Sequence, residues 1–164
     1  RLGRGQVLSG LRANNKKDSL EAALDDLIKE VRLLSDNKVG ALIVLERTTG
    51  LKDLIDSGIS LNADLSAELL GSIFNRKSPL HDGAVVIRGQ KVLAASVFLP
   101  LSEEIEDTSL GTRHRAALGL SKETDALVII VSEETGRISL AIRGKLDSIK
   151  PDRLERKLKR LIIK

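Results

Sequence analysis

The sequence predicts one α/β domain: a central mixed β-sheet flanked by helices on both faces. Two observations predict this class. Short apolar runs of strand length alternate with helical stripes, and a hairpin pattern is inserted between them. The length of 164 residues corresponds to about one domain. The 41% hydrophobic and 30% charged residues supply one core and a charged surface.

The first half of the chain predicts three helices and one strand. An Asp-Ser start signal and an apolar stripe predict an amphipathic helix over residues 18–36. The continuous apolar run at 40–46 is typical of a strand buried on both faces. A short helix is expected at 51–57, and a further helix capped by Asp64 or Ser66 follows.

The middle of the chain predicts a hairpin and then a helix. Strands are expected at 84–87 and 92–99, joined by a glycine-containing turn. After an acidic loop, Ser109 or Thr112 is expected to cap a helix that ends at Gly119.

The last third predicts two strands, 126–131 and 138–142, and a basic amphipathic helix that Pro151 opens. We therefore expect three segments: an N-terminal linker at 1–17, the domain proper at 18–150 and a C-terminal basic helix at 151–164.

Composition excludes several classes of site. The chain has no Cys, which excludes disulfides, Cys-ligated zinc and a thiol nucleophile. Neither a P-loop nor a dinucleotide-binding glycine motif occurs. Aromatic residues make up only 1% of the chain, too few to stack successive bases of a nucleic acid. The net charge of +4 favours anionic partners.

Three polar clusters lie at predicted element boundaries. The first is His81-Asp82-Gly83, before a buried strand; its alternative reading is an ordinary Asp-Gly turn. The second runs from Thr112 to Arg115 and places cations at a helix N-terminus. The helix dipole disfavours cations there, but phosphate suits the site; the alternative is a solvated basic turn.

The third cluster, Ser132–Gly136, offers two carboxylates after a buried strand, and its alternative reading is a hairpin with solvated glutamates. Together the clusters supply a carboxylate, an imidazole and an anion clamp. This combination indicates metal-assisted phosphoryl or nucleotidyl transfer.

Four linked motifs resemble the bacterial diadenylate cyclase domain, and they occur in the same order. The resemblance runs from Ala22 to Ile142 and is most similar to the membrane-anchored branch of that family. The motifs are Pro79–Ala84, Leu99–Ser102, Gly111–Ala117 and Val131–Gly136.

The resemblance implies synthesis of cyclic di-AMP from two ATP, with release of two pyrophosphates. It implies that Asp82 activates the ribose 3′-hydroxyl, and that a divalent cation, Mg²⁺ or Mn²⁺, is held by His81 with Glu134. The implied nucleotide-binding residues are Gly83, Ala84, Phe98, Leu99, Thr112, Arg113, His114, Arg115 and Ser132. Phe98 replaces a Tyr common in the family, so stacking on adenine is retained without the hydroxyl.

The resemblance also implies a transient face-to-face homodimer, because the product is two-fold symmetric. No nucleic-acid partner is expected. The chain is expected to be the soluble part of a membrane-anchored protein, on the cytoplasmic side, with transmembrane helices upstream. Two other readings stay open: a nucleotide-binding sensor without turnover, and a small basic nucleic-acid-binding domain.

Overall fold

A computed structural model of the chain describes residues 3–101 and 110–163, with side-chain surroundings from residue 15 onward. The strands are β1 (Ala41–Leu45), β2 (Ile59–Asp64), β3 (Ala84–Arg88), β4 (Lys91–Val97), β5 (Leu127–Val131), β6 (Ile138–Ile142) and β7 (Lys145–Ile149). The helices are α1 (Gly3–Asp36), α2 (Lys52–Ser57), α3 (Ala67–Ile73), α4 (Thr112–Glu123) and α5 (Pro151–Ile162).

The strands form one mixed sheet in the order β2-β4-β3-β1-β5-β6-β7. β1 and β3 pair in parallel and the other neighbours are antiparallel. The predicted α/β class is confirmed, and all five predicted strands are present. The two strands that the sequence did not predict, β2 and β7, are the two edges. They are half exposed and carry no continuous apolar run.

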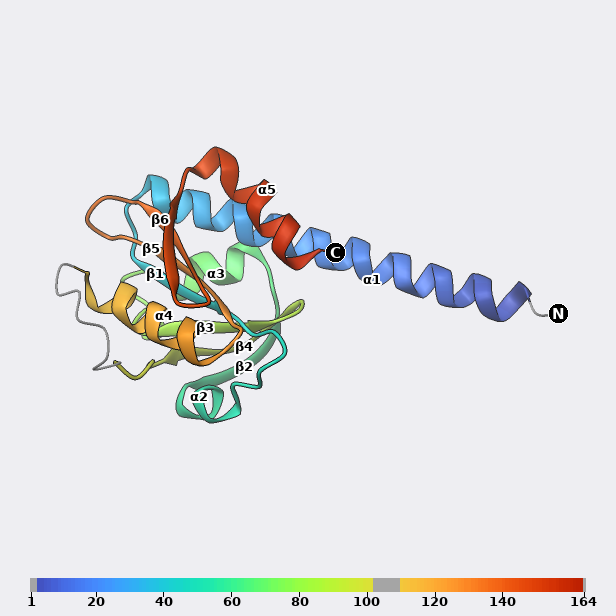
Figure 1. Ribbon diagram of the computed structural model, residues 1–164, viewed down its shortest axis with the longest axis horizontal. Coiled ribbons are helices and arrows are strands. Elements are labelled where there is room, and N and C mark those ends of the chain that lie inside the picture. The colour runs from blue at the N-terminus through green and yellow to red at the C-terminus, as the bar shows by residue number, and fades with distance from the viewer. Residues whose placement is uncertain (1–2, 102–109, 164) are drawn as a thin grey trace.

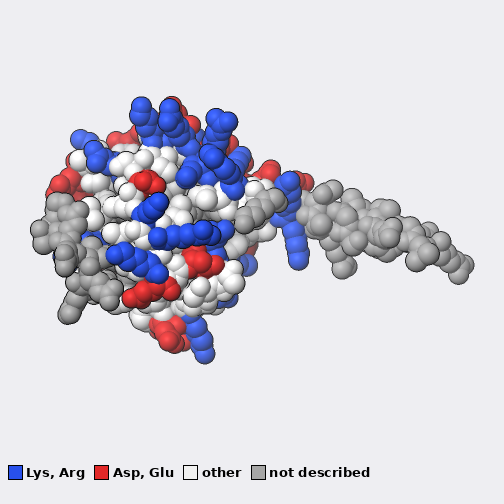
Figure 2. Space-filling view, viewed as in Figure 1, with Lys and Arg blue, Asp and Glu red and all other residues white. Residues whose placement is uncertain are grey.

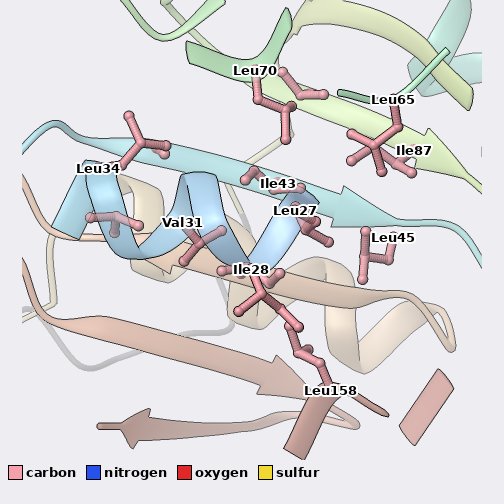
Figure 3. Packing of buried hydrophobic residues seen from close by; sticks show 14 of the residues in the cluster. Leu27, Ile28, Val31, Leu34, Ile43, Leu45, Leu65, Leu70, Ile87 and Leu158 are labelled. Atoms are coloured by element: carbon pink, nitrogen blue, oxygen red, sulfur yellow. The ribbon is translucent and has the colours of Figure 1, made fainter. Parts of the chain in front are cut away.

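One face of the sheet is covered by α1, α3 and α5 (Figure 1). Large aliphatic side chains fill this layer. In Figure 3, Leu27 of α1 lies beside Ile43 of β1, and Ile28 lies beside Leu158 of α5. The stripe predicted for 18–36 is therefore the buried stripe of α1, because side chains three and four residues apart share one side of a helix.

The opposite face is covered by α2 and α4, and its side chains are smaller. Ala117 and Leu120 of α4 pack against Ala141 and Val128 of the sheet. This layer leaves room beside the start of α4, where a hollow opens between the helix and the ends of β5, β6 and β7.

α1 begins at Gly3, well before the predicted start at Asp18, so residues 3–17 are helical where the sequence suggested a linker. No Pro occurs before Pro79, and nothing in residues 3–17 forces the helix to end. Figure 1 shows this part of α1 running out past the sheet. Within the described residues, no helix is both long and apolar enough to cross a bilayer.

The cap predicted for α4 is wrong. Gly111 is the N-cap residue, and it has no side chain with which to cap the helix. Thr112 is the first helical residue, and Ser109 lies outside the described residues. The helix continues past Gly119, which is buried, to Glu123. For α3 the alternatives resolve to Ser66, whose hydroxyl accepts from the N–H of Leu69, while Asp64 ends β2.

α5 packs on the domain through Leu154 and Leu158, both fully buried. Its outer side carries the exposed cations Arg153, Arg156 and Arg160. Figure 2 shows Lys and Arg side chains gathered over this helix. Acidic residues of the same helix, Asp152 and Glu155, interrupt the positive charge, so the basic residues form a solvated helix face.

Candidate functional site

Three loops meet at one end of the sheet. β1 and β3 run in parallel and begin there, and β5, antiparallel to β1, ends there. The loop before β1 contains Gly40, the loop before β3 contains His81 and Asp82, and the turn after β5 begins at Ser132. The topology thus brings together two of the three predicted clusters, and the start of α4 brings the third.

Two hollows open at this end and share two residues. The larger, about 710 Å³, lies between the start of α4 and the strands β5, β6 and β7. The smaller, about 590 Å³, contains His81 and Asp82 together with Gly40, Phe74 and Arg76. Arg113 and Glu133 line both, so the two hollows are adjoining halves of one site.

His81 is held through the backbone carbonyl of Ser78, which accepts from the N–H of His81 at 3.4 Å and lies beside its ring. Nδ1 of His81 lies 2.7 Å from the carbonyl oxygen of Ser78, which only accepts, so Nδ1 carries a proton. Nε2 lies 3.2 Å from Oδ1 of Asp82. One ring nitrogen and one carboxylate thus lie within reach of the same cation.

The Gly83–Ala84 step brings the backbone close to the end of β4. Gly83 has φ +89°, and a Cβ there would lie 2.9 Å from the carbonyl oxygen of Val97, so only Gly fits. Ala84 is fully buried and pairs with Val97. β4 ends at Val97, and the next residue, Phe98, is 66% exposed.

Phe98 is therefore not part of the hydrophobic core. Leu99 instead packs against the layer under α4. Neither residue lines the two hollows.

Arg113 is the side chain that joins the two halves of the site. Its Nη1 lies 3.5 Å from Oε2 of Glu133. A Cβ on Gly40 would lie 2.9 Å from the same Nη1, so the guanidinium packs directly against the backbone of Gly40. Thr112 and His114 line the larger hollow beside it. Gly111 has no side chain to cap the first N–H groups of α4, and among the described residues no other cap is seen, so these groups can bind an anion.

His114 sits in a positive environment. Burial first, and then the charges of Arg113 and Arg137, lower the pKa of its imidazole. Arg115, by contrast, lines neither hollow. Its Nε atom is buried without a hydrogen-bond partner among the described residues. Residues two apart on a helix point to different sides, which separates Arg115 from Arg113.

The turn after β5 is tightly bonded. The hydroxyl of Ser132 accepts from the N–H groups of Glu134 and Thr135, each at 3.3 Å. The backbone N–H of Ser132 donates to the carbonyl of Arg137 at 3.0 Å. At the far side, the hydroxyl of Ser35 in α1 donates to the carbonyl of Gly136 at 2.5 Å. The end of α1 thus holds this turn in place.

The donor set fits a divalent cation in part. The described residues contain no group of three or more His, Asp or Glu side chains that could hold a metal ion. His81 and Asp82 provide one nitrogen and one carboxylate within 3.2 Å of each other. A cation that takes its remaining ligands from phosphates and water suits such a pair. Glu134 lines the larger hollow, whereas His81 lines the smaller one.

The sequence analysis missed three residues of the site, Gly40, Arg76 and Arg137, whereas Glu133 is one of the two carboxylates of the third predicted cluster. Gly40 and Arg76 line the smaller hollow, Arg137 lines the larger one, and Glu133 lines both. Gly40 carried a weak signal, since a Gly before a buried strand often marks close approach of another group. Arg76 and Arg137 look like ordinary charged loop residues in the sequence.

Comparisons with known proteins agree with the geometry. Residues 29–146 match the family model DAC, described as DisA bacterial checkpoint controller nucleotide-binding. The chain is 44% identical over 146 residues to the cyclic di-AMP synthase CdaA of Bacillus subtilis, a match that covers 88% of this chain and 53% of that protein. The chain therefore spans about half the length of this curated relative.

Solved structures agree as well. A crystal structure of a double mutant of DacA from Staphylococcus aureus superposes with a TM-score of 0.83 at 44% identity, covering 88% of this chain and 97% of that one. A structure described as a hypothetical membrane spanning protein from Bacillus cereus superposes with a TM-score of 0.73 at 50% identity, covering 77% and 62%.

Proposed function

The chain belongs to the DAC family, and from this membership we propose that it is a diadenylate cyclase, a nucleotidyltransferase that makes cyclic di-AMP from two ATP. The 3′-oxygen of one ATP attacks the α-phosphorus of the other. The bond between that phosphorus and the oxygen bridging to the β-phosphate breaks, pyrophosphate leaves, and the hydroxyl proton is lost. A second, identical step closes the ring.

One observation carries the proposal: Arg113 and Glu133 belong to both hollows. A nucleotide that places its phosphates at the start of α4 can therefore reach the His81–Asp82 pair with its sugar. The enzyme's tasks in this reaction are alignment and neutralisation of phosphate charge. The adjoining hollows suit both tasks.

The larger hollow would hold the phosphates. Thr112, Arg113 and His114 offer uncapped backbone N–H groups, a guanidinium and an imidazole. Ser132, at the opposite wall, would contact phosphate as well. The position of Arg115 outside the hollow suits a supporting role in the same helical turn.

The smaller hollow would hold the reacting sugar. Asp82, whose side chain is 69% exposed, would orient the 3′-hydroxyl and accept its proton. Gly83 and Ala84 would approach the nucleotide through their backbone, and the adenine would stack on Phe98 next to Leu99. His81 and Asp82, with Glu134 nearer the phosphates, would bind Mg²⁺ or Mn²⁺. The cation would withdraw charge from the phosphate oxygens.

Two copies of the site must meet, because each ATP has to present its hydroxyl to the phosphate of the other. We propose a transient face-to-face homodimer with no nucleic-acid partner. We further propose that residues 18–150 form the catalytic unit and α5 an accessory helix. The relative described as membrane spanning supports a full-length protein anchored in the membrane, with this domain on the cytoplasmic side.

The test is chromatography of products after incubation with ATP and either Mg²⁺ or Mn²⁺. Cyclic di-AMP and pyrophosphate in a ratio of one to two are expected. Retention of ATP without product would assign the chain as a nucleotide-binding sensor instead.

A dilution series tests the dimer. Below the dimerisation constant, the rate should rise with the square of protein concentration, and above it linearly. Constant specific activity from a protein that stays monomeric in sedimentation, with and without a non-hydrolysable ATP analogue, would refute the face-to-face mechanism.

A further inference from the structure

We propose that Arg137 binds the terminal phosphates of the nucleotide, the pyrophosphate that leaves, and so makes the site selective for triphosphates over diphosphates. This inference rests on the proposed function and names the part of the site that reads the length of the phosphate chain.

The pleat of β6 aims Arg137 at the larger hollow. Ile138 and Leu140 belong to the layer under α1 and α5, whereas Ala141 belongs to the layer under α4. Side chains alternate between faces along a strand, so Arg137 projects to the same side as Ser139. Arg137, Ser139 and Ser148 line the wall of the larger hollow opposite α4.

The backbone of Arg137 is fixed on both sides of its Cα. Its N–H donates to the hydroxyl of Thr135 at 3.1 Å. Its carbonyl accepts from the N–H of Ser132 at 3.0 Å. The bond from Ser35 to Gly136 ties the same turn to α1. The backbone that carries this cation is therefore held before any ligand arrives, which lowers part of the entropic cost of binding.

Among the described residues, Arg137 and Arg113 differ in whether a carboxylate lies beside them. Arg113 has Glu133 at 3.5 Å, but within the described ranges no carboxylate lies within 4.0 Å of Arg137. The positive charge of Arg137 acts on the first turn of α4, because it contributes to the lowered pKa of His114. A polyphosphate between the two walls would relieve this repulsion.

The geometry separates roles along the phosphate chain. Arg113 lines the smaller hollow, which would hold the reacting sugar, and this places it nearer the α-phosphate. Of the two hollows, Arg137 lines only the larger one. A diphosphate would be held by the α4 side and would be too short to gain the full contact with Arg137.

The test compares Arg137→Gln with Arg137→Lys and with Arg153→Gln, an exposed cation on α5 outside both hollows. The probes are 3′-deoxy-ATP and 3′-deoxy-ADP, which lack the attacking hydroxyl, and affinity is measured by calorimetry. We expect Arg137→Gln to weaken triphosphate binding by about tenfold and diphosphate binding by less than about threefold. Arg137→Lys should regain part of the loss, because a point charge replaces the fork.

A second readout tests the location of Arg137 directly. Removing its positive charge should raise the pKa of His114 in the nucleotide-free protein, followed by histidine NMR, while Arg153→Gln should leave it unchanged. Equal losses for both nucleotides, a loss no larger than that of Arg153→Gln, or an unmoved His114 titration would overturn the proposal.

Failure of this inference is distinguishable from failure of the proposed function. If the wild type makes cyclic di-AMP but Arg137→Gln keeps the ratio of the two affinities, the Arg137 assignment alone is wrong. If the wild type binds the triphosphate with the expected dependence on Arg137 but forms no product, the cyclase proposal alone is wrong. If it binds neither nucleotide, both are wrong.

Discussion

The two halves of the candidate site differ in how firmly the chain holds their side chains. The wall formed by the β5–β6 turn is bonded within itself through Ser132 and to α1 through Ser35. The loop carrying His81 and Asp82 is bonded within itself at Ser78, but its bond to β4, from the hydroxyl of Ser96 to the carbonyl of Pro79, is long at 3.5 Å, and the Asp82 side chain is 69% exposed.

This difference indicates which half is complete within one chain. An anion-binding wall gains affinity from being rigid, since nothing has to be ordered when the phosphates arrive. The reacting half must admit the phosphate of a second nucleotide, and an open carboxylate suits that role. We therefore expect variants of the loop to affect turnover and variants of the wall to affect binding.

The largest effect should come from Asp82→Asn. The amide keeps the shape of the side chain but does not accept the hydroxyl proton, so product formation should fall by about 10³-fold or more. ATP affinity should stay within a few-fold, measured by calorimetry. Asp147→Asn, an exposed change on β7, serves as the control. Near-normal turnover of Asp82→Asn would reject its role and the division between the two halves.

The next largest effect should be the loss of nucleotide binding in the double variant Arg113→Ala, Arg115→Ala. Because charge-assisted contacts to phosphate are lost, affinity should fall by about 100-fold. Single variants sharpen the comparison: Arg113→Ala should account for most of the loss, since Arg113 lines both hollows and Arg115 lines neither. Unchanged affinity in the double variant would show that the phosphates bind elsewhere.

His81→Ala should raise the metal concentration needed for half-maximal activity by about tenfold, because one imidazole ligand is lost. The measurement is a titration of activity with Mn²⁺ and with Mg²⁺ at saturating ATP. ATP binding in the absence of metal should be unaffected. Identical titrations for the variant and the wild type would leave His81 as a structural residue of its loop.

The smallest effect is expected for Ser35→Ala, which removes the bond from α1 to the β5–β6 turn. The loss of one partly buried hydrogen bond should lower the free energy of unfolding by about 1 kcal/mol, and KM should rise about two- to threefold with kcat nearly unchanged. Ser57→Ala, which removes an exposed local bond in α2 to the carbonyl of Leu54, should leave KM unchanged. The same KM for both variants would mean that α1 does not position the wall.

The sequence located the central part of this fold because burial leaves a clear pattern. β1 and β5 are fully buried and read as unbroken apolar runs, and the buried face of α1 reads as a helical stripe. The edges β2 and β7 are exposed on much of their surface, so nothing in their composition separates them from loops.

The sequence by itself determined the chemistry that the chain can offer: one imidazole–carboxylate pair, one cationic helix start and one carboxylate turn, each on a short contiguous segment. Only the tertiary structure decided which of these groups meet. Parallel pairing of β1 with β3 and antiparallel pairing of β1 with β5 bring the three loops to one end of the sheet. Gly40 lies beside Glu133 only through the pairing of β1 with β5, because a residue far along the chain becomes a neighbour through strand register and not through local pattern.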